Sequence, residues 1–160
     1  MSRRVSFGFT LIELVVTVAI VGLLASMALP MAELVVKRNN EQELRHSLRE
    51  IRGALDNYKQ AVDEGRVKSS LLQSGYPASL KVLVDGVPDE TDPDKQRKIY
   101  FLRRIPRDQM FKDPSKSDEE TWGKRSYASS ADSPEEGDDV FDVYSLSPGI
   151  GLNGIGYKNW

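Results

Sequence analysis

The stretch that decides the fold is residues 8–30, GFTLIELVVTVAIVGLLASMALP. Between residues 9 and 29 the only charged side chain is that of Glu13. An α-helix rises about 1.5 Å per residue, so roughly 21 residues span about 30 Å, the thickness of the hydrocarbon core of a bilayer. The stretch therefore predicts one membrane-spanning helix that carries a lone carboxylate near its start.

The residues on either side of this stretch bear on its orientation. Residues 1–8, MSRRVSFG, are basic and contain no acid, and two further basic residues, Lys37 and Arg38, follow the span. Counts of positive charge therefore hardly distinguish the two orientations. A leader this short is easily retained on the cytoplasmic side, so we expect the N-terminus in the cytoplasm.

Other interpretations of the apolar stretch compete with a permanent anchor. A secretory signal peptide fits the basic start and the small residues near position 26, although its apolar part is normally shorter and rarely carries an acid near its start. Residues 2–4, SRR, resemble a twin-arginine signal, but Phe7 lies one place later than that pattern requires. A buried helix is disfavoured, because a domain this small hardly encloses a helix that is apolar all round.

A second helical pattern begins after Pro30. Large apolar side chains recur at alternating steps of four and three residues, at Leu44, Leu48, Ile51, Leu55, Tyr58 and Val62. This spacing predicts an amphipathic helix over residues 31–65, continuous with the apolar one and ending near Gly65. Pro30 lies at the join, where its missing backbone donor favours a kink. The stripe is too short for a coiled coil and is interpreted as a core face.

The remaining residues, 66–160, are interrupted by turn signals. A short helix is expected over residues 76–84, closed by Asp85 and Gly86, and is followed by a polar loop over residues 88–98. Strands are expected at residues 122–127 and 140–146. The sequence therefore predicts an α+β fold: a long N-terminal α-helix, with an apolar transmembrane half and an amphipathic half, packed on a small antiparallel β-sheet.

Composition excludes several kinds of function. The 160 residues contain 22 Lys and Arg against 24 Asp and Glu, so the charge balance does not favour nucleic acid as a partner. The absence of cysteine excludes disulfides, thiolate metal sites and a cysteine nucleophile. His46 is the only histidine, and no set of catalytic partners surrounds it in the sequence, so a solvated side chain is favoured over a general base.

Two further patterns were weighed as binding sites. Residues 149–154, GIGLNG, match the nucleotide-binding pattern G-x-G-x-x-G, but the few residues after them cannot supply the helix and βαβ unit that the pattern needs, which favours a glycine-rich loop. Acidic residues at 89–94, and Asp138, Asp139 and Asp142, offer oxygen ligands for calcium, yet neither group has the EF-hand layout. No enzyme signature is found, and we expect no catalytic residue.

Residues 8–30 resemble the N-terminus of type IV pilins and of the pseudopilins of type II secretion. In that class a short basic leader ends in glycine, the mature chain usually begins with phenylalanine, and a glutamate lies five residues into it. Gly8, Phe9 and Glu13 match those three positions. The motif is highly specific, because leader, glycine, acid and apolar length all have to coincide.

Later segments resemble the major, or G-type, pseudopilin. They are GYPASLKVLV at residues 75–84, YFLRRIPRDQMF at 100–111, TWGKRSY at 121–127 and FDVYSLSPG at 141–149. The resemblance implies a long helix, a variable segment and a small antiparallel sheet, in agreement with the pattern of the residues.

The sequence departs from that type in two places. Gln109 and Met110 stand where proline and tryptophan are common, and residues 147–149, SPG, replace the start of an acidic loop that holds calcium in G-type pseudopilins. The loss of those acids argues against calcium, so we expect no cofactor, with Asp138, Asp139 and Asp142 as weak calcium candidates. The missing cysteines argue mildly against many type IV pilus subunits.

The resemblance also implies a domain organisation. Residues 1–8 would be a cytoplasmic leader that prepilin peptidase removes between Gly8 and Phe9, after which Phe9 is N-methylated. Residues 9–30 would be the transmembrane and filament-core helix, residues 31–65 the amphipathic helix, and residues 66–160 a periplasmic globular domain. The protein would cross the bacterial inner membrane once.

The function implied is that of a structural subunit of the periplasmic pseudopilus of type II secretion, polymerised through its N-terminal helix. Its partners would be prepilin peptidase, other copies of itself, other pseudopilins, inner-membrane secretion components and membrane lipid. Two alternatives remain open: a minor pilin of a type IV pilus, and a membrane-anchored periplasmic binding domain that never polymerises. The second leaves Glu13 without an evident reason, because acids within membrane spans are rare.

Glu13 is the residue on which assembly would depend. A carboxylate in the membrane costs about 3 kcal/mol on insertion scales, so a partner cation is strongly favourable there. Cleavage after Gly8 would create an ammonium at Phe9, either one helical turn away in the same chain or on a neighbouring subunit, and both pairings remain open. The pairing between subunits would set their axial register, and a head-to-tail contact that does not close generates a helical filament.

Overall fold

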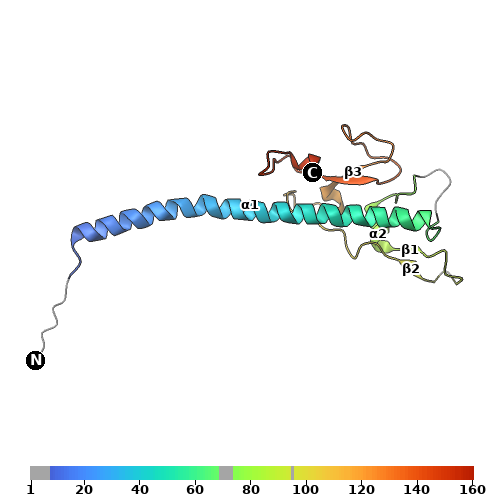
Figure 1. Ribbon diagram of the computed structural model, residues 1–160, viewed down its shortest axis with the longest axis horizontal. Helices are drawn as coiled ribbons and strands as arrows, with labels where there is room; N and C mark the ends of the chain where they lie inside the picture. The colour runs from blue at the N-terminus through green and yellow to red at the C-terminus, as the bar shows by residue number, and fades with distance from the viewer. Residues whose placement is uncertain (1–7, 69–73, 95) are drawn as a thin grey trace, which may run out of the picture. The chain divides into compact units, whose positions relative to one another are not determined.

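The computed structural model describes residues 8–68, 74–94 and 96–160. The chain divides into two compact units, Met1–Asn39 and Asn40–Trp160. Figure 1 shows the elements along the chain, from helix α1 to the short strands and turns that follow it. The leader predicted over residues 1–8 lies outside the described residues except for Gly8.

The first unit consists of the apolar part of helix α1. This helix runs Leu11–Asp63 and continues through Pro30 without a break in its assignment. Every side chain described between residues 8 and 26 is exposed within the chain. By length and composition, the helix is apolar enough to cross a membrane. The prediction of a long N-terminal helix with an apolar half is therefore confirmed.

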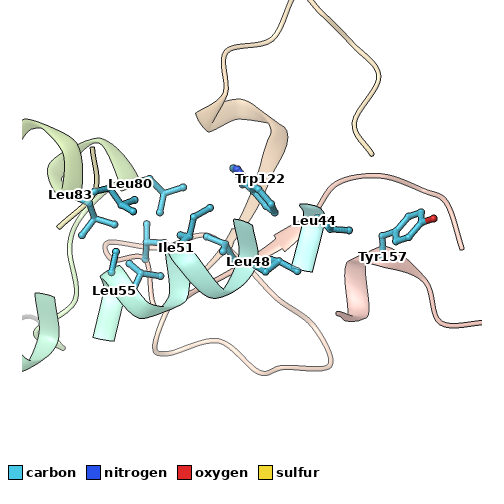
Figure 2. Packing of buried hydrophobic residues seen from close by; sticks show 12 residues of the cluster. Leu44, Leu48, Ile51, Leu55, Leu80, Leu83, Trp122 and Tyr157 are labelled. Atoms are coloured by element: carbon cyan, nitrogen blue, oxygen red, sulfur yellow. The ribbon is translucent and has the colours of Figure 1, made fainter. Parts of the chain in front are cut away.

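The part of α1 within the second unit buries one stripe of its surface. Leu44, Ile51 and Leu55 are fully buried and Leu48 nearly so. Figure 2 shows these side chains on one face of the helix, with Leu80 and Leu83 of helix α2 (Leu80–Asp85) packed against them. The alternating four- and three-residue spacing in the sequence is thus the core face of the globular unit.

Helix α1 ends in a glycine-dependent turn. Gly65 has a φ of 73°, in the left-handed region, and its N–H donates to the carbonyl of Val62 at 3.0 Å. The N–H of Arg66 donates to the carbonyl of Ala61 at 2.8 Å. These two bonds form a Schellman motif, which satisfies carbonyl groups that the last turn leaves free. The end lies within two residues of the predicted one.

Helix α2 is shorter than the helix predicted over residues 76–84. It begins after Ser79 and ends at Asp85, where Gly86 adopts a φ of 73°. The loop predicted at 88–98 is flanked by a small pairing that the sequence did not reveal: β1 (Val87–Pro88) pairs antiparallel with β2 (Lys98–Ile99). The N–H groups of Phe101 and Leu102 both donate to the carbonyl of Leu83 at 3.0 Å, which joins this pairing to α2.

A second antiparallel pair follows. Strand β3 (Trp122–Arg125) pairs with β4 (Asp142–Ser145), with Trp122 opposite Ser145 and Arg125 opposite Asp142. Both strands were predicted, and both are shorter than expected. Gly123 is required here, because a Cβ would lie 2.3 Å from the ring of Tyr144 on the paired strand. The α+β fold with small antiparallel sheets is therefore confirmed, and the described residues form two two-stranded sheets in place of the one expected.

The core of the second unit is completed by aromatic side chains and one buried acid. Trp122 and Tyr157 are each 1% exposed, and the indole N–H of Trp122 donates to the carbonyl of Pro106 at 2.7 Å. Asp108 is fully buried and accepts hydrogen bonds from the Ser145 hydroxyl at 2.5 Å and the Met110 N–H at 2.8 Å. Burial raises the pKa of the Asp108 carboxyl.

Candidate processing and assembly site

The first turn of α1 is closed by Thr10 and Glu13. The Thr10 N–H and the Thr10 hydroxyl both donate to Oε2 of Glu13 at 2.8 Å, and the Glu13 N–H donates to the Thr10 hydroxyl at 3.3 Å. Thr10 also accepts, through its carbonyl, the first helical bond from the Leu14 N–H at 3.2 Å. This reciprocal arrangement is a capping box, in which side chains satisfy backbone donors that the helix cannot.

The capping box leaves one polar atom of the apolar segment without a partner. The hydroxyls of Thr17 and Ser26 donate to the carbonyls of Leu14 and Leu23 at 2.9 and 2.7 Å, so the helix itself satisfies them. Within residues 8–26, Oε1 of Glu13 is the side-chain oxygen that neither donates nor accepts a hydrogen bond. One side of the carboxylate is thus used within the chain, and the other is open to a donor from elsewhere.

Gly8 and Phe9 lie immediately before this cap. Both are outside the helix, and the Phe9 side chain is 88% exposed. A Cβ added at Gly8 would meet nothing within 4 Å, so the fold of the chain alone does not require glycine at that position. The bond between Gly8 and Phe9 is therefore accessible, and a cut there would place an ammonium beside the N-terminal residue of the capping box.

The surface around the site is apolar and uncovered. Leu11, Ile12 and Leu14 are 80%, 70% and 60% exposed, and the apolar residues from Val15 to Leu24 that carry large side chains are about half exposed or more. Full burial of one such side chain is worth about 1.5–3 kcal/mol. An apolar surface of this kind has to be covered by lipid or by other protein.

The calcium candidates have separate surroundings in the structure. Asp142 pairs with the guanidinium groups of Arg52 at 2.7 Å and Arg125 at 3.3 Å. Asp139 accepts hydrogen bonds from the Ser74 hydroxyl and from the Tyr127 N–H, the latter at 2.8 Å, and Asp138 is exposed. Among the residues that the structure describes, no three His, Cys, Asp or Glu side chains gather as a metal site would require.

The structure also places the two remaining candidates from the sequence, His46 and the glycine-rich residues 149–154. His46 is an exposed residue of α1. Residues 149–154 form a loop in which the Gly151 N–H donates to the Ile155 carbonyl at 2.8 Å and Ile150 pairs with Gly156. A short 3₁₀ turn, Tyr157–Asn159, follows this loop.

Two residues with defined contacts were missed in the sequence. Thr10 could have been found, because Thr10 and Glu13 stand in the S/T-x-x-E spacing of a capping box just before an apolar run. Glu41 precedes Leu44 by one turn on the buried face of α1 and is itself 6% exposed. An acid on an apolar stripe was the available signal for Glu41.

Comparisons with known proteins bear on both parts of the chain. Residues 3–29 match the family model described as the prokaryotic N-terminal methylation motif. The type II secretion system core protein G of Pseudomonas aeruginosa is 31% identical over 114 residues, which cover 68% of this chain and 70% of that protein. The protein of the same name from Aeromonas hydrophila is 29% identical over 111 residues, with the same coverage of 68% and 70%. No solved structure matches the chain.

Proposed function

The chain belongs to the family of type II secretion system core protein G, the major pseudopilins. On that premise we propose that prepilin peptidase cleaves the chain. We also propose that the mature chain polymerises into a periplasmic pseudopilus through its N-terminal helix. Cleavage falls between Gly8 and Phe9, and Phe9 becomes the methylated N-terminus. Both relatives are named as secretion-system core proteins, and neither name is that of an enzyme.

The observation that carries this proposal is the state of the first half of α1. Its described large apolar side chains are about half exposed or more, while the hydroxyls of Thr17 and Ser26 are satisfied within the helix. A helix with its backbone and polar side chains satisfied internally suits lipid, because lipid offers no hydrogen-bond partners. The same surface suits neighbouring helices of its own kind, so one helix serves as the inner-membrane anchor and then as part of the filament core.

Glu13 gives this helix an axial register. Oε2 stays in the capping box, and Oε1 accepts from the ammonium of Phe9 on an adjacent subunit. A hydrogen bond between charged groups in a surrounding of low dielectric is stronger than one in water, and an unpaired carboxylate there is costly. Each subunit thus presents a carboxylate and an ammonium at fixed heights, and the head-to-tail contact repeats along a fibre without closing.

This arrangement also implies the side of the membrane on which each part of the chain is proposed to lie. The leader stays in the cytoplasm, the chain passes the inner membrane once, and the globular domain lies in the periplasm. Other pseudopilins and inner-membrane secretion components contact the fibre, and membrane lipid surrounds the helix before assembly. Nucleic acid has no role, because the chain carries a slight excess of acids.

The processing step is tested on protein extracted from membranes of cells that contain prepilin peptidase. Mass spectrometry of the wild-type chain should give a mature N-terminus at Phe9 with one added methyl group. Gly8→Val should remain at full length, although the fold tolerates a side chain there. A mature chain that starts near residue 29 would instead indicate a cleaved secretory signal, and a shortened Gly8→Val product would refute the assigned cut.

The assembly step is tested with disulfide crosslinking between helices. The chain contains no cysteine, so Val18→Cys, at a side chain 63% exposed, places one thiol per subunit on the apolar surface. A disulfide-linked dimer is expected in the Val18→Cys background, since each subunit carries one thiol, and its yield should fall at least tenfold when Glu13→Ala is added, with membrane insertion unchanged. Glu33→Ala is the matched control, because it removes an exposed carboxylate of the same helix beyond the predicted span, and it should keep the yield of crosslinked dimer.

A further variant separates two roles of Glu13. Thr10→Val removes the hydroxyl of the capping box and keeps the carboxylate, so it should retain more crosslinking than Glu13→Ala. Equal losses in the two variants would reduce Glu13 to a helix cap. Wild-type chains that are processed but never crosslink would support the anchored domain that does not polymerise, and incorporation into a surface pilus in place of the secretion fibre would support a minor pilin.

A further inference from the structure

The last fifteen residues form a loop that is tied to helix α1 by a buried carboxylate. Oε1 of Glu41 accepts a hydrogen bond from the Leu152 N–H at 2.8 Å and another from the Tyr157 hydroxyl at 2.9 Å. Both Glu41 and Tyr157 are almost completely buried. Burial and the bond to Glu41 raise the pKa of Tyr157 to about 12, so the phenol stays protonated and donates at any physiological pH.

Carbonyl groups of the same loop are occupied by donors from the chain. The carbonyl of Gly149 accepts from the Tyr157 N–H at 3.1 Å, and that of Gly151 from the Gly154 N–H at 2.9 Å. The carbonyl of Ile155 accepts from the Gly151 N–H at 2.8 Å and from the indole N–H of Trp160 at 3.3 Å. The loop is therefore closed by its own backbone, with its glycines allowing the tight path.

The side chains of α1 hold the far end of the loop. Arg52 donates to the carbonyl of Trp160 at 2.9 Å and to the carbonyl of Val143 at 3.0 Å. The guanidinium of Arg45 lies 4.3 Å from the centre of the Trp160 ring, a cation–π contact. Three residues of one helix, Glu41, Arg45 and Arg52, thus contact the loop at separate points.

The polar atoms of the C-terminal loop that face Glu41 are hydrogen-bond donors, which do not bind a cation. Calcium takes six to eight oxygen ligands, most often from Asp and Glu and from free carbonyls. Residues 146–160 contain no Asp or Glu. At the point where the loop meets Glu41, it offers the N–H of Leu152 and the O–H of Tyr157, which are donors that suit an anion. The residues present therefore do not fit the calcium that the G-type resemblance implies.

We propose that Glu41 takes over the organising role that a bound calcium ion has in other members of the family, so that the C-terminal loop of this protein folds without metal. The carboxylate comes from the helix and the donors come from the loop, which is the reverse of a cation held by loop oxygens. The loop is thereby built into the same core as Leu44, one turn further along α1.

The experiment measures the thermal stability of the full chain in detergent micelles, with calcium in excess or with a chelator. The two tryptophans, Trp122 and Trp160, both lie in the second unit, so their fluorescence reports on it alone. The wild-type Tm should change by less than about 1 °C between the two conditions. Glu41→Ala should lower Tm by about 5–10 °C in both, because the buried Tyr157 hydroxyl and the partly buried Leu152 N–H lose their acceptor.

Two further variants make the result specific to the contact. Glu43→Ala removes an exposed carboxylate from the same turn of α1 and should leave Tm within about 1 °C of the wild type. Tyr157→Phe removes one donor and keeps the ring, so it should cost less than Glu41→Ala and still fold. The double variant should be less destabilised than the sum of the two single ones, since both remove the same bond.

The proposal fails on either of two outcomes. A rise in the wild-type Tm of several degrees on adding calcium would show that the loop holds the metal. Additive effects of Glu41→Ala and Tyr157→Phe would show that the two groups do not act together. Both measurements concern the globular unit of a single chain, so neither depends on whether the protein forms fibres.

Discussion

The two parts of helix α1 both carry large apolar side chains and use them in opposite ways. In the first unit, Ile20 and its neighbours are about half exposed or more among the residues that the structure describes. In the second unit, Ile51 is fully buried among Leu48, Leu55 and the residues of α2. The sequence pattern differs accordingly, since the first half is apolar on all sides and the second only along a stripe.

This difference separates the stability of the chain from its assembly. Burial within the second unit contributes to the folding of one molecule, because the partner side chains belong to the same chain. The exposed half contributes nothing to that folding, and its apolar surface is available for lipid or for other subunits. Substitutions in the second half should therefore change the stability of the globular unit, and substitutions in the first half should change assembly between subunits.

The largest effect is expected from a matched pair of isoleucines. Ile51→Ala removes a fully buried side chain and should lower the free energy of unfolding of the second unit by about 4 kcal/mol, or its Tm by more than about 10 °C. Ile20→Ala makes the same chemical change at a side chain 52% exposed and should shift Tm by less than about 1 °C. Tryptophan fluorescence during thermal unfolding measures both.

The same pair should reverse in the crosslinking assay. Ile20→Ala is expected to lower the yield of the Val18→Cys dimer, whereas Ile51→Ala should leave that yield unchanged at temperatures where the second unit stays folded. Equal shifts in Tm for the two variants would show that the first half of α1 contributes to the folding of the globular unit, and the separation drawn between the halves would be wrong.

A smaller effect is expected at Asp108, a fully buried acid of the second unit. Asp108→Ala leaves the Ser145 hydroxyl and the Met110 N–H without their acceptor and should cost about 2 kcal/mol at neutral pH. The cost should also depend on pH. Burial raises the pKa of Asp108 above its unfolded value, so its contribution is complete below that value and declines as the pH rises through the folded pKa.

Urea unfolding at pH 3.5 and pH 7 measures this dependence. The loss caused by Asp108→Ala should be larger at pH 3.5 than at pH 7, because the neutral carboxyl is the form that the buried site favours. Asp132→Ala, at an exposed acid, serves as the control and should show little change at either pH. A loss that grows as the pH rises would mean that the buried carboxylate is stabilised in its charged form.

Much of the fold could be predicted because its signals are local. The apolar run, the stripe from Leu44 and the glycines at positions 65 and 86 mark the long helix and two turns, and the structure has both glycines at positive φ. Gly8, Phe9 and Glu13 were found from a motif of adjacent positions, and their roles in processing and assembly stay predictions. Short-range patterns of this kind need no knowledge of distant contacts.

What the sequence did not reveal depends on distant contacts. The pairing of Val87–Pro88 with Lys98–Ile99 involves only two residues in each strand and includes a proline, so no alternating pattern marks it. Strand β3 stops at Arg125 because the next N–H, that of Ser126, bonds to the carbonyl of Glu135. The contact of Glu41 with Tyr157 joins residues 116 positions apart, so the acid on the apolar stripe could mark Glu41 but not its partner.

The smallest effects are expected at two glycines of the second unit, which differ in backbone conformation. A Cβ at Gly53 or at Gly65 would meet nothing within 4 Å, so an alanine side chain fits at both positions without a steric clash. Gly53 lies inside α1, and Gly53→Ala should stabilise the unit by about 0.5–1 kcal/mol, because alanine loses less conformational entropy in a helix. Gly65→Ala should destabilise it by about 1 kcal/mol, because Gly65 has a φ of 73°. Urea midpoints that move in opposite directions would show that α1 is a regular helix at Gly53 and ends in the Schellman turn, whereas a stabilising Gly65→Ala would mean that the helix continues past Asp63 in solution.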